Sequence, residues 1–416
     1  MTEPTDGGLA LLQSAFMNPE MAANPFPMYQ MMRGMGSVMQ IPMSFGGGTG
    51  WVVSRFEEAV QVLKDNQHFT VDASLIDSTR GVFGQAMAAA NPGANFLNNR
   101  TMVSVDEPDH TRLRGLVSKA FTPRFIESLR PHIQEIADEL LDRVQDAHRM
   151  DVVTDFGYPL PINVISDMLG VPKDQRAKIS EWSQSLTGGN FQGGADGGRE
   201  QSSRMFSNYV AELVAEKRKH PGDDLISKLI EEEATGDHLD ETELLSMVGI
   251  LIFAGHETTS NLIDIGTLML LDHPDQLEML KATPSLIPSA IEELLRFNGP
   301  VTMPAPRFVL QDTELGGQQL HRGDMIIVMV ASANRDEQQF SDPEELNIAR
   351  DLNRHIAFGQ GIHYCLGAPL ARMEGEIAFS TLLRRMPDLH FAVPREEITW
   401  RNNMALRGLL SLPVAF

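Results

Sequence analysis

The stretch that decides the fold is Phe358-Gly359-Gln360-Gly361-Ile362-His363-Tyr364-Cys365-Leu366-Gly367, which holds the only cysteine of the 416 residues. Glycines surround this thiol, and glycine permits positive φ angles and close approach of the backbone to a flat ligand. From residue 366 the apolar periodicity predicts a helix that runs to residue 385. Cys365 is therefore expected at a helix N-terminus, where the dipole and the free N–H groups stabilise a thiolate.

The longest helical pattern of the chain, residues 240–271, has a polar break at its centre. It reads Ala254-Gly255-His256-Glu257-Thr258-Thr259-Ser260 after an almost wholly apolar turn. A mid-helix glycine costs up to about 1 kcal/mol relative to alanine, and Ser or Thr side chains can bond back to carbonyls and bend the helix. An isolated break of this kind would be read as a surface turn, so its meaning depends on the rest of the sequence.

The remaining periodicity predicts a mainly α fold with a minor β part. Helices are expected over residues 107–120, 122–146, 160–169, 172–186, 200–219, 224–233, 275–281 and 285–297. Strands are expected at 51–53, within 301–330 and after 385, with a long loop over 72–100 and a glycine-rich link over 187–198. Residues 1–23 are expected to form a flexible arm, and residues 24–416 a single domain.

Composition limits the class of protein. The formal net charge is −22 with a pI near 4.9, which argues against binding to nucleic acid or to anionic membranes through the average field. One cysteine allows no internal disulfide, which fits a reducing compartment. We see no secretory signal and no run of about 18 apolar residues, so we expect a cytoplasmic protein without a membrane anchor.

Two motifs together resemble the cytochrome P-450 family, in particular its soluble bacterial, ferredoxin-dependent members. The cysteine segment fills every fixed position of F-x-x-G-x-H-x-C-x-G, and the polar break matches A/G-G-x-D/E-T-T/S. The resemblance extends from about Asn24 to the end of the chain. It implies a haem b held between the long central helix and the cysteine segment, with Cys365 as the axial ligand of the iron. Phe358, Gly359 and Gly367 would then contact the haem.

By the same resemblance, three residues of the central helix would take part in catalysis. Gly255 would leave room for dioxygen above the iron, Thr258 would hydrogen-bond the activated oxygen, and Glu257 would belong to the proton relay for O–O cleavage. The resemblance also implies cationic partners for the haem propionates, for which the candidates are His110, Arg114, Arg307 and His363.

Glu293 and Arg296 lie at i, i+3 and look like the family's E-x-x-R pair, a structural element beneath the haem. Many members supply a third partner, often an arginine from a D-P-x-R segment. Here Glu345 stands where that arginine is expected, which leaves the third contact open. Backbone carbonyls are the alternative partners of Arg296.

The resemblance implies an apolar substrate pocket that takes a steroid, terpenoid, fatty acid or polyketide. Its expected lining is Ile250, Leu251, Ala254, Val301, Thr302, Met303, Asn403 and Met404. Electrons from NAD(P)H would arrive through a separate ferredoxin and ferredoxin reductase, and the candidate docking residues are Arg112, Lys119 and Arg372. We expect a monomer.

Three other functions compete with this one. A peroxide-driven peroxygenase generally lacks the acid–alcohol pair that Glu257 and Thr258 form here. A non-catalytic haem sensor has no need of a proton relay. A haem-free helical protein would use Cys365 as an ordinary buried residue.

Overall fold

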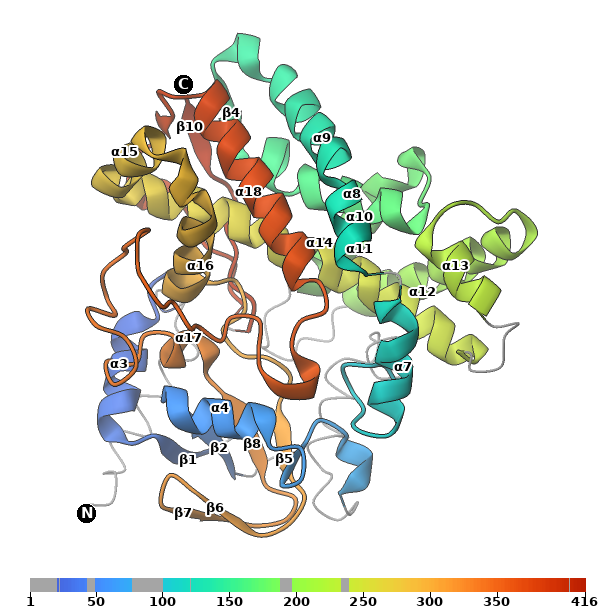
Figure 1. Ribbon diagram of the computed structural model, residues 1–416, viewed down its shortest axis with the longest axis vertical. Coiled ribbons are helices and arrows are strands. Elements are labelled where there is room, and N and C mark those ends of the chain that lie inside the picture. Colours follow the sequence, from blue (N-terminus) through green and yellow to red (C-terminus); the bar gives the residue numbers. More distant parts are fainter. Residues whose placement is uncertain are drawn as a thin grey trace.

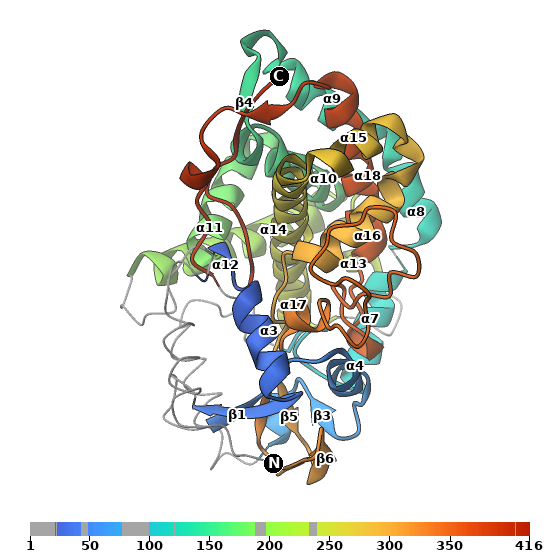
Figure 2. The same ribbon diagram turned by 90° about the vertical axis from the view of Figure 1, so that its left-hand side faces the viewer.

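The computed structural model describes residues 21, 23–42, 49–76, 100–119, 121–187, 197–232, 239–403 and 405–416. Most of the expected N-terminal arm, the greater part of the 72–100 loop, the centre of the 187–198 link and Met404 lie outside these residues. Figures 1 and 2 show helices gathered on one side of the molecule and a small sheet at one end.

The central element is α14, Glu241–Asp272, which crosses the helical part (Figure 1). Its start is fixed by a capping box, because the Asp240 side chain accepts from the Glu243 N–H and the Glu243 side chain accepts from the Asp240 N–H. Four helices pack against it: α10 (Pro159–Leu169), α12 (Gly197–Lys219), α16 (Ile287–Asn298) and α18 (Ala368–Arg385). The helical prediction for this region is confirmed.

Shorter helices complete the described part of the chain. They are α3 (Phe26–Met35), α4 (Phe56–Lys64), α7 (Asp109–Ser118), α8 (Pro123–Ser128), α9 (Arg130–Asp142), α11 (Arg176–Thr187), α13 (Leu225–Glu232), α15 (Pro274–Ala282) and α17 (Val330–Ala333). Single turns are η1 (Ala73–Leu75), η2 (Gln145–Ala147), η4 (Lys173–Gln175), η6 (Pro284–Leu286), η7 (Gly361–His363) and η8 (Arg395–Glu397), and η3 (Val153–Gly157) is a π-helical turn.

The strands form two sheets and a hairpin. The five-stranded sheet has the order β1-β2-β8-β5-β3, with β1 Val38–Pro42, β2 Thr49–Val53, β3 Phe69–Thr70, β5 Arg307–Val309 and β8 Met325–Val328. The three-stranded sheet β4-β10-β9 joins Arg149–Asp151 to Pro413–Ala415 and His390–Phe391. The hairpin pairs β6 Thr313–Leu315 with β7 Gln318–Leu320. The sheets thus tie both ends of the chain to its middle.

Two helix boundaries differ from the prediction. The helix expected over 122–146 is two helices, because Pro131 has no N–H to donate and stands in the first turn of α9. The helix expected from residue 366 begins at Ala368, since Cys365 to Gly367 form the turn that leads into it. Cys365 therefore lies three residues before the first residue of the helix, and not directly before it as predicted.

The cysteine segment rests on the N-terminal part of the chain. Gly361 has a φ of 71°, and a Cβ built on it would lie 2.5 Å from the carbonyl oxygen of Leu63 at the end of α4. Only glycine fits this contact, both in conformation and in space. The position of the thiol therefore depends on α4, some 300 residues earlier in the chain.

Candidate functional site

Cys365 is accessible to solvent although protein surrounds it. Its N–H donates to the carbonyl oxygen of Phe358 at 2.9 Å, which closes the loop between them, and Gly359 turns that loop with a φ of 72°. The sulfur therefore faces a recess and not the outer surface. Gly367 adjoins it, since a Cβ on Gly367 would lie 4.0 Å from the sulfur.

The electrostatics of Cys365 correct one expectation. Burial raises the pKa of the thiol, and this effect outweighs the N–H groups of Gly367 and Ala368 and the charge of Arg114, all of which lower it. The helix start alone does not make a thiolate here. A thiol in such a place ionises when a metal ion coordinates it.

Glu292 braces the cysteine segment from α16. Its carboxylate accepts from Arg372 on α18 at 2.6 and 2.8 Å and lies 3.1 Å from His355 Nε2. Arg372 in turn stacks over the Phe358 ring at 4.5 Å and donates to the Tyr364 hydroxyl. Although burial alone would raise it, the pKa of Glu292 is lowered to about 2 by Arg372 and His355. Glu292 is a residue that the sequence analysis missed.

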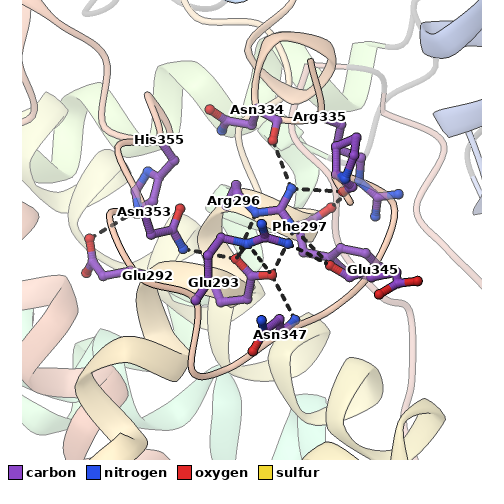
Figure 3. A network of polar contacts seen from close by, with 12 residues as sticks. Glu292, Glu293, Arg296, Phe297, Asn334, Arg335, Glu345, Asn347, Asn353 and His355 are labelled. Carbon is purple, nitrogen blue, oxygen red and sulfur yellow. Dashed lines mark hydrogen bonds and ion pairs between the residues drawn. The ribbon is translucent and has the colours of Figure 1, made fainter. Parts of the chain in front are cut away.

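Glu293 and Arg296, whose side chains are fully buried, form the centre of a second network (Figure 3). All five N–H donors of Arg296 are used. Two bonds reach the Glu293 carboxylate at 2.7 and 2.8 Å, and three reach backbone carbonyls of Asn334, Pro343 and Glu345 at 2.9 to 3.1 Å. Glu345 thus contributes its carbonyl oxygen, while its side chain takes no part in these bonds.

The open third contact is supplied by Arg350. Its Nε lies 3.1 and 3.0 Å from the two carboxylate oxygens of Glu293. The D-P-x-R pattern places the arginine at position 345, whereas Arg350 lies five residues later. The sequence analysis missed it for this reason. Glu293 also accepts from the Asn347 N–H and the Asn353 side chain, and the network fixes the irregular segment that leads to Cys365.

The expected propionate residues lie together around Asp106. His363 Nε2 is 2.7 Å from Asp106 Oδ1, and the His110 and His363 rings are 4.5 Å apart. Arg307 is buried and donates to the Ala305 carbonyl at 3.0 Å, and burial lowers its pKa to about 10, with Asp106 opposing the effect. Arg114 acts electrostatically on both His110 and Cys365.

This cluster is short of negative charge. Both ring nitrogens of His110 are buried without a hydrogen-bond partner among the described residues. Burial first, then His363 and Arg114, lowers the pKa of His110 to about 4. Within the described cluster, Asp106 is the carboxylate that acts on His110, His363 and Arg307, and Thr70 and the Val71 N–H also bond it. A flat group that offers a metal to Cys365 and carboxylates to His110, Arg114 and Arg307 fits this arrangement, and haem has that chemistry.

The polar break of α14 presents two different faces. Ala254 is exposed and Thr258 is partly exposed, although the helix around them is buried, and the Thr258 hydroxyl donates to the Ala254 carbonyl at 3.1 Å. Gly255 faces elsewhere, since a Cβ on it would lie 2.9 Å from Ile165 of α10. The glycine therefore permits close packing of α10 on α14, and Ala254 is the residue at the accessible face.

Glu257 lies behind this face, with 1% of its surface exposed. One carboxylate oxygen forms an ion pair with Arg401; the other has no hydrogen-bond partner among the described residues and lies 3.9 Å from His256 Nε2. Next to it, His256 Nδ1 is 2.7 Å from the Ile252 carbonyl, so Nδ1 carries the proton and Nε2 accepts from the Tyr158 hydroxyl at 3.0 Å. Arg401 and Tyr158 were not found from the sequence, because no local motif marks them.

The expected pocket residues divide into two groups. Ala254 is exposed, and Val301 and Met303 are partly exposed, whereas Ile250 and Leu251 are 7% exposed. Two others have structural contacts. Thr302 is fully buried and its side chain bonds the Tyr29 hydroxyl, and Asn403 Oδ1 accepts from the N–H groups of Ala405 and Leu406.

Two of the three expected docking residues form ion pairs within the protein. Nη1 and Nη2 of Arg112 bond Glu243 at the start of α14, and Arg372 is paired with Glu292 as described above. These cations are neutralised within the protein. Lys119 lies elsewhere, on a groove lined also by Phe125 and Lys228.

Within the described residues, no helix is both long and apolar enough to cross a bilayer. The Cytochrome P450 family model matches residues 197–283 and 284–397. Cytochrome P450 CYP107DY1 of Priestia megaterium is 45% identical over 89% of this chain and 91% of its own length. Polyketide biosynthesis cytochrome P450 PksS of Bacillus subtilis is 43% identical over 94% of this chain and 96% of its own length.

The fold gives the same answer. The crystal structure of myxobacterial cytochrome P450 CYP267B1 in complex with myristic acid superposes with a TM-score of 0.88 at 39% identity, covering 96% of this chain and 98% of that one. Identity and coverage of this size carry both the fold and the enzyme class. The chain therefore belongs to the cytochrome P450 family of haem monooxygenases.

Proposed function

We propose that the chain inserts one oxygen atom of O₂ into a lipophilic small molecule of the polyketide class, by hydroxylation or epoxidation. The observation behind this proposal is that two kinds of binding group lie near one another. The accessible Cys365 thiol can bind a metal ion, and the unpartnered His110 ring beside Arg114 and Arg307 can bind carboxylates. When bound there, haem b supplies the redox chemistry that activates O₂.

In this proposal the Cys365 thiolate would bind the haem iron, and His110, Arg114, Arg307 and His363 would hold the two propionates. Phe358, Gly359 and Gly367 would contact the haem. The bracing of Phe358 by Arg372 supports this assignment, because it fixes the loop that carries the sulfur. The networks around Glu292 and Glu293 hold the thiol in place and take no part in the chemistry.

Ala254 to Thr258, which we call the oxygen-activation segment, handles protons. Ala254 leaves space on the accessible face, and the Thr258 hydroxyl stands on that same face. Behind it, Glu257 takes up a proton and passes it toward Thr258, while Arg401 fixes the orientation of the carboxylate. This acid–alcohol pair is what distinguishes the proposal from a peroxide-driven peroxygenase.

A polyketide is the substrate class we favour. PksS is named for polyketide biosynthesis, and this chain matches it over 94% of its own length. The accessible residues Ala254, Val301 and Met303 are apolar, which suits a large lipophilic molecule. Arg112 and Arg372 do not serve as free docking charges, so the proposed ferredoxin, reduced by its reductase with NAD(P)H, binds through other residues.

The test begins with the purified haem protein. Reduced and treated with carbon monoxide, it should show the red-shifted Soret band of thiolate ligation, and a Cys365→Ser variant should not. A panel of macrolactones, fatty acids and steroids is then screened for the low- to high-spin optical shift. Turnover of the best ligand with ferredoxin, reductase and NADPH supports the proposal, while turnover with peroxide alone would favour the peroxygenase.

A further inference from the structure

A buried polar stripe runs along α14 away from the oxygen-activation segment. Glu257, Asn261 and Asp264 stand at i, i+4 and i+7, so they share one face of the helix over about 10 Å of its length. Their exposed fractions are 1%, 1% and 0%. A helix in the centre of a protein ordinarily buries apolar residues on such a face, so three adjacent polar side chains need a reason.

The segments opposite the stripe make room for it. A Cβ built on Gly157 would lie 1.9 Å from Asp264 Oδ1, and a Cβ built on Gly408 would lie 2.4 Å from Asn261 Oδ1. Gly157 is the last residue of η3, which packs on α14. The carbonyl oxygen of Gly408 accepts from the Arg401 N–H. Both surfaces therefore present bare backbone to the polar atoms.

The stripe is rich in open hydrogen-bonding atoms. One oxygen of Glu257, both amide atoms of Asn261 and both carboxyl oxygens of Asp264 are buried without a partner among the described residues. Buried polar groups of this kind are commonly satisfied by internal water. A set of five open atoms in one row suits a short file of water molecules.

Asp264 cannot carry a charge cheaply in this position. An unpaired buried carboxylate costs several kcal/mol, and Asp264 has no ion pair with a described residue. Burial raises the pKa of Asp264 well above its ordinary value; Arg401 opposes this, and the like charges of Asp151 and Glu257 add to it. Burial without a partner therefore favours the protonated carboxyl, and in that form it can both donate and accept.

Asp151 is a partly exposed carboxylate whose charge acts on Asp264. It lies at the end of β4 and accepts from the N–H groups of Val153 and Leu412 and from the Ser411 hydroxyl. The other titratable groups beside the stripe, His256 and Tyr158, bond each other. Asp264 thus lies within electrostatic reach of both the partly exposed Asp151 and Glu257.

We propose that Asp264 is the proton reserve behind Glu257, an inference that rests on the proposed function. When Glu257 has given up its proton toward Thr258, the Asp264 carboxyl passes its own proton, through water held by Asn261, to the Glu257 carboxylate. Asp264 then regains a proton from solvent on the Asp151 side. Asp264 touches neither substrate nor haem, so it is a relay residue that acts through Glu257.

The first test does not depend on turnover. Infrared spectra of the ferric haem protein at neutral pH are compared between wild type and Asp264→Asn. The wild type should show a C=O stretch of a protonated carboxyl that shifts in D₂O and is lost in the variant. Glu374→Gln is the matched control, because Glu374 is also fully buried without a described partner, and its change should remove a different band. No band lost in Asp264→Asn would overturn the proposal.

The second test measures coupling with ferredoxin, reductase and a ligand that gives the spin shift. Asp264→Asn should lower product formation on the order of tenfold, divert electrons to peroxide and raise the solvent deuterium isotope effect. Its spin shift and thermal midpoint should equal those of wild type. Thr267→Val is the control, since that buried hydroxyl bonds the Ile263 carbonyl of the same helix. Wild-type coupling and isotope effect in Asp264→Asn would refute the relay, whereas an inactive wild type would refute the proposed function itself.

Discussion

Replacing Arg296 by lysine should destabilise the protein strongly although it keeps the charge. The guanidinium uses five donors on five buried bonds, and an ammonium has three. At least two acceptors then lose their donor. An unsatisfied buried acceptor costs about 1–3 kcal/mol, so the free energy of unfolding should fall by about 2–6 kcal/mol.

The assay is urea unfolding of the haem protein, followed by tryptophan fluorescence and by the Soret band. Glu345→Ala is the matched control, because Arg296 bonds the Glu345 backbone carbonyl, which the substitution leaves in place. This control should stay within about 0.5 kcal/mol of wild type, as surface substitutions usually do. The proposed role of the Arg296 bonds is wrong if Arg296→Lys has the free energy of unfolding of wild type, or if Glu345→Ala lowers that free energy as much as Arg296→Lys does.

Three further outcomes are expected. Glu292→Gln should lower the urea midpoint at neutral pH and make that midpoint less dependent on pH in acid. The carboxylate contributes its full stabilisation above its ordinary pKa of 4.5 and loses it as pH falls toward about 2. An unchanged pH profile of the midpoint would count against the Arg372 pairing. Gly255→Val should weaken folding because its side chain meets Ile165, and a thermal midpoint equal to that of wild type would contradict this packing. Thr258→Val should keep the spin shift but release more peroxide per electron pair, and full coupling in this variant would exclude the hydroxyl from proton delivery.

Local motifs could be predicted from the sequence, because a short segment carries its own evidence. The helical character, the long central helix and the minor sheet follow from periodicity and turn residues. The glycines around Cys365 required a tight loop, and Gly359 and Gly361 indeed have positive φ. The cysteine segment and the E-x-x-R pair are therefore recognisable from their residues alone.

Partners that are distant in sequence could not be predicted. Arg401 meets Glu257 across 144 positions, and Glu292 meets Arg372 across 80, and nothing in either local sequence selects the other. The ion pairs of Arg112 and Arg372 could not be predicted for the same reason, since counting cations cannot show which carboxylates neutralise them. Gly255 was interpreted through its motif, whereas its packing partner Ile165 belongs to another helix.

The contact between Gly361 and the end of α4 has a consequence for how the protein is made. The last 178 residues, from 239 on, contain Cys365, the oxygen-activation segment and both glutamates of α16, yet the loop that carries the sulfur is seated on Leu63. During synthesis, α4 leaves the ribosome long before Cys365 does, so the contact between α4 and the cysteine segment can form only late. A C-terminal fragment that contains the cysteine segment and the oxygen-activation segment would still lack α4, against which the cysteine segment packs. We therefore expect such a fragment not to bind haem, and haem binding to require the complete chain.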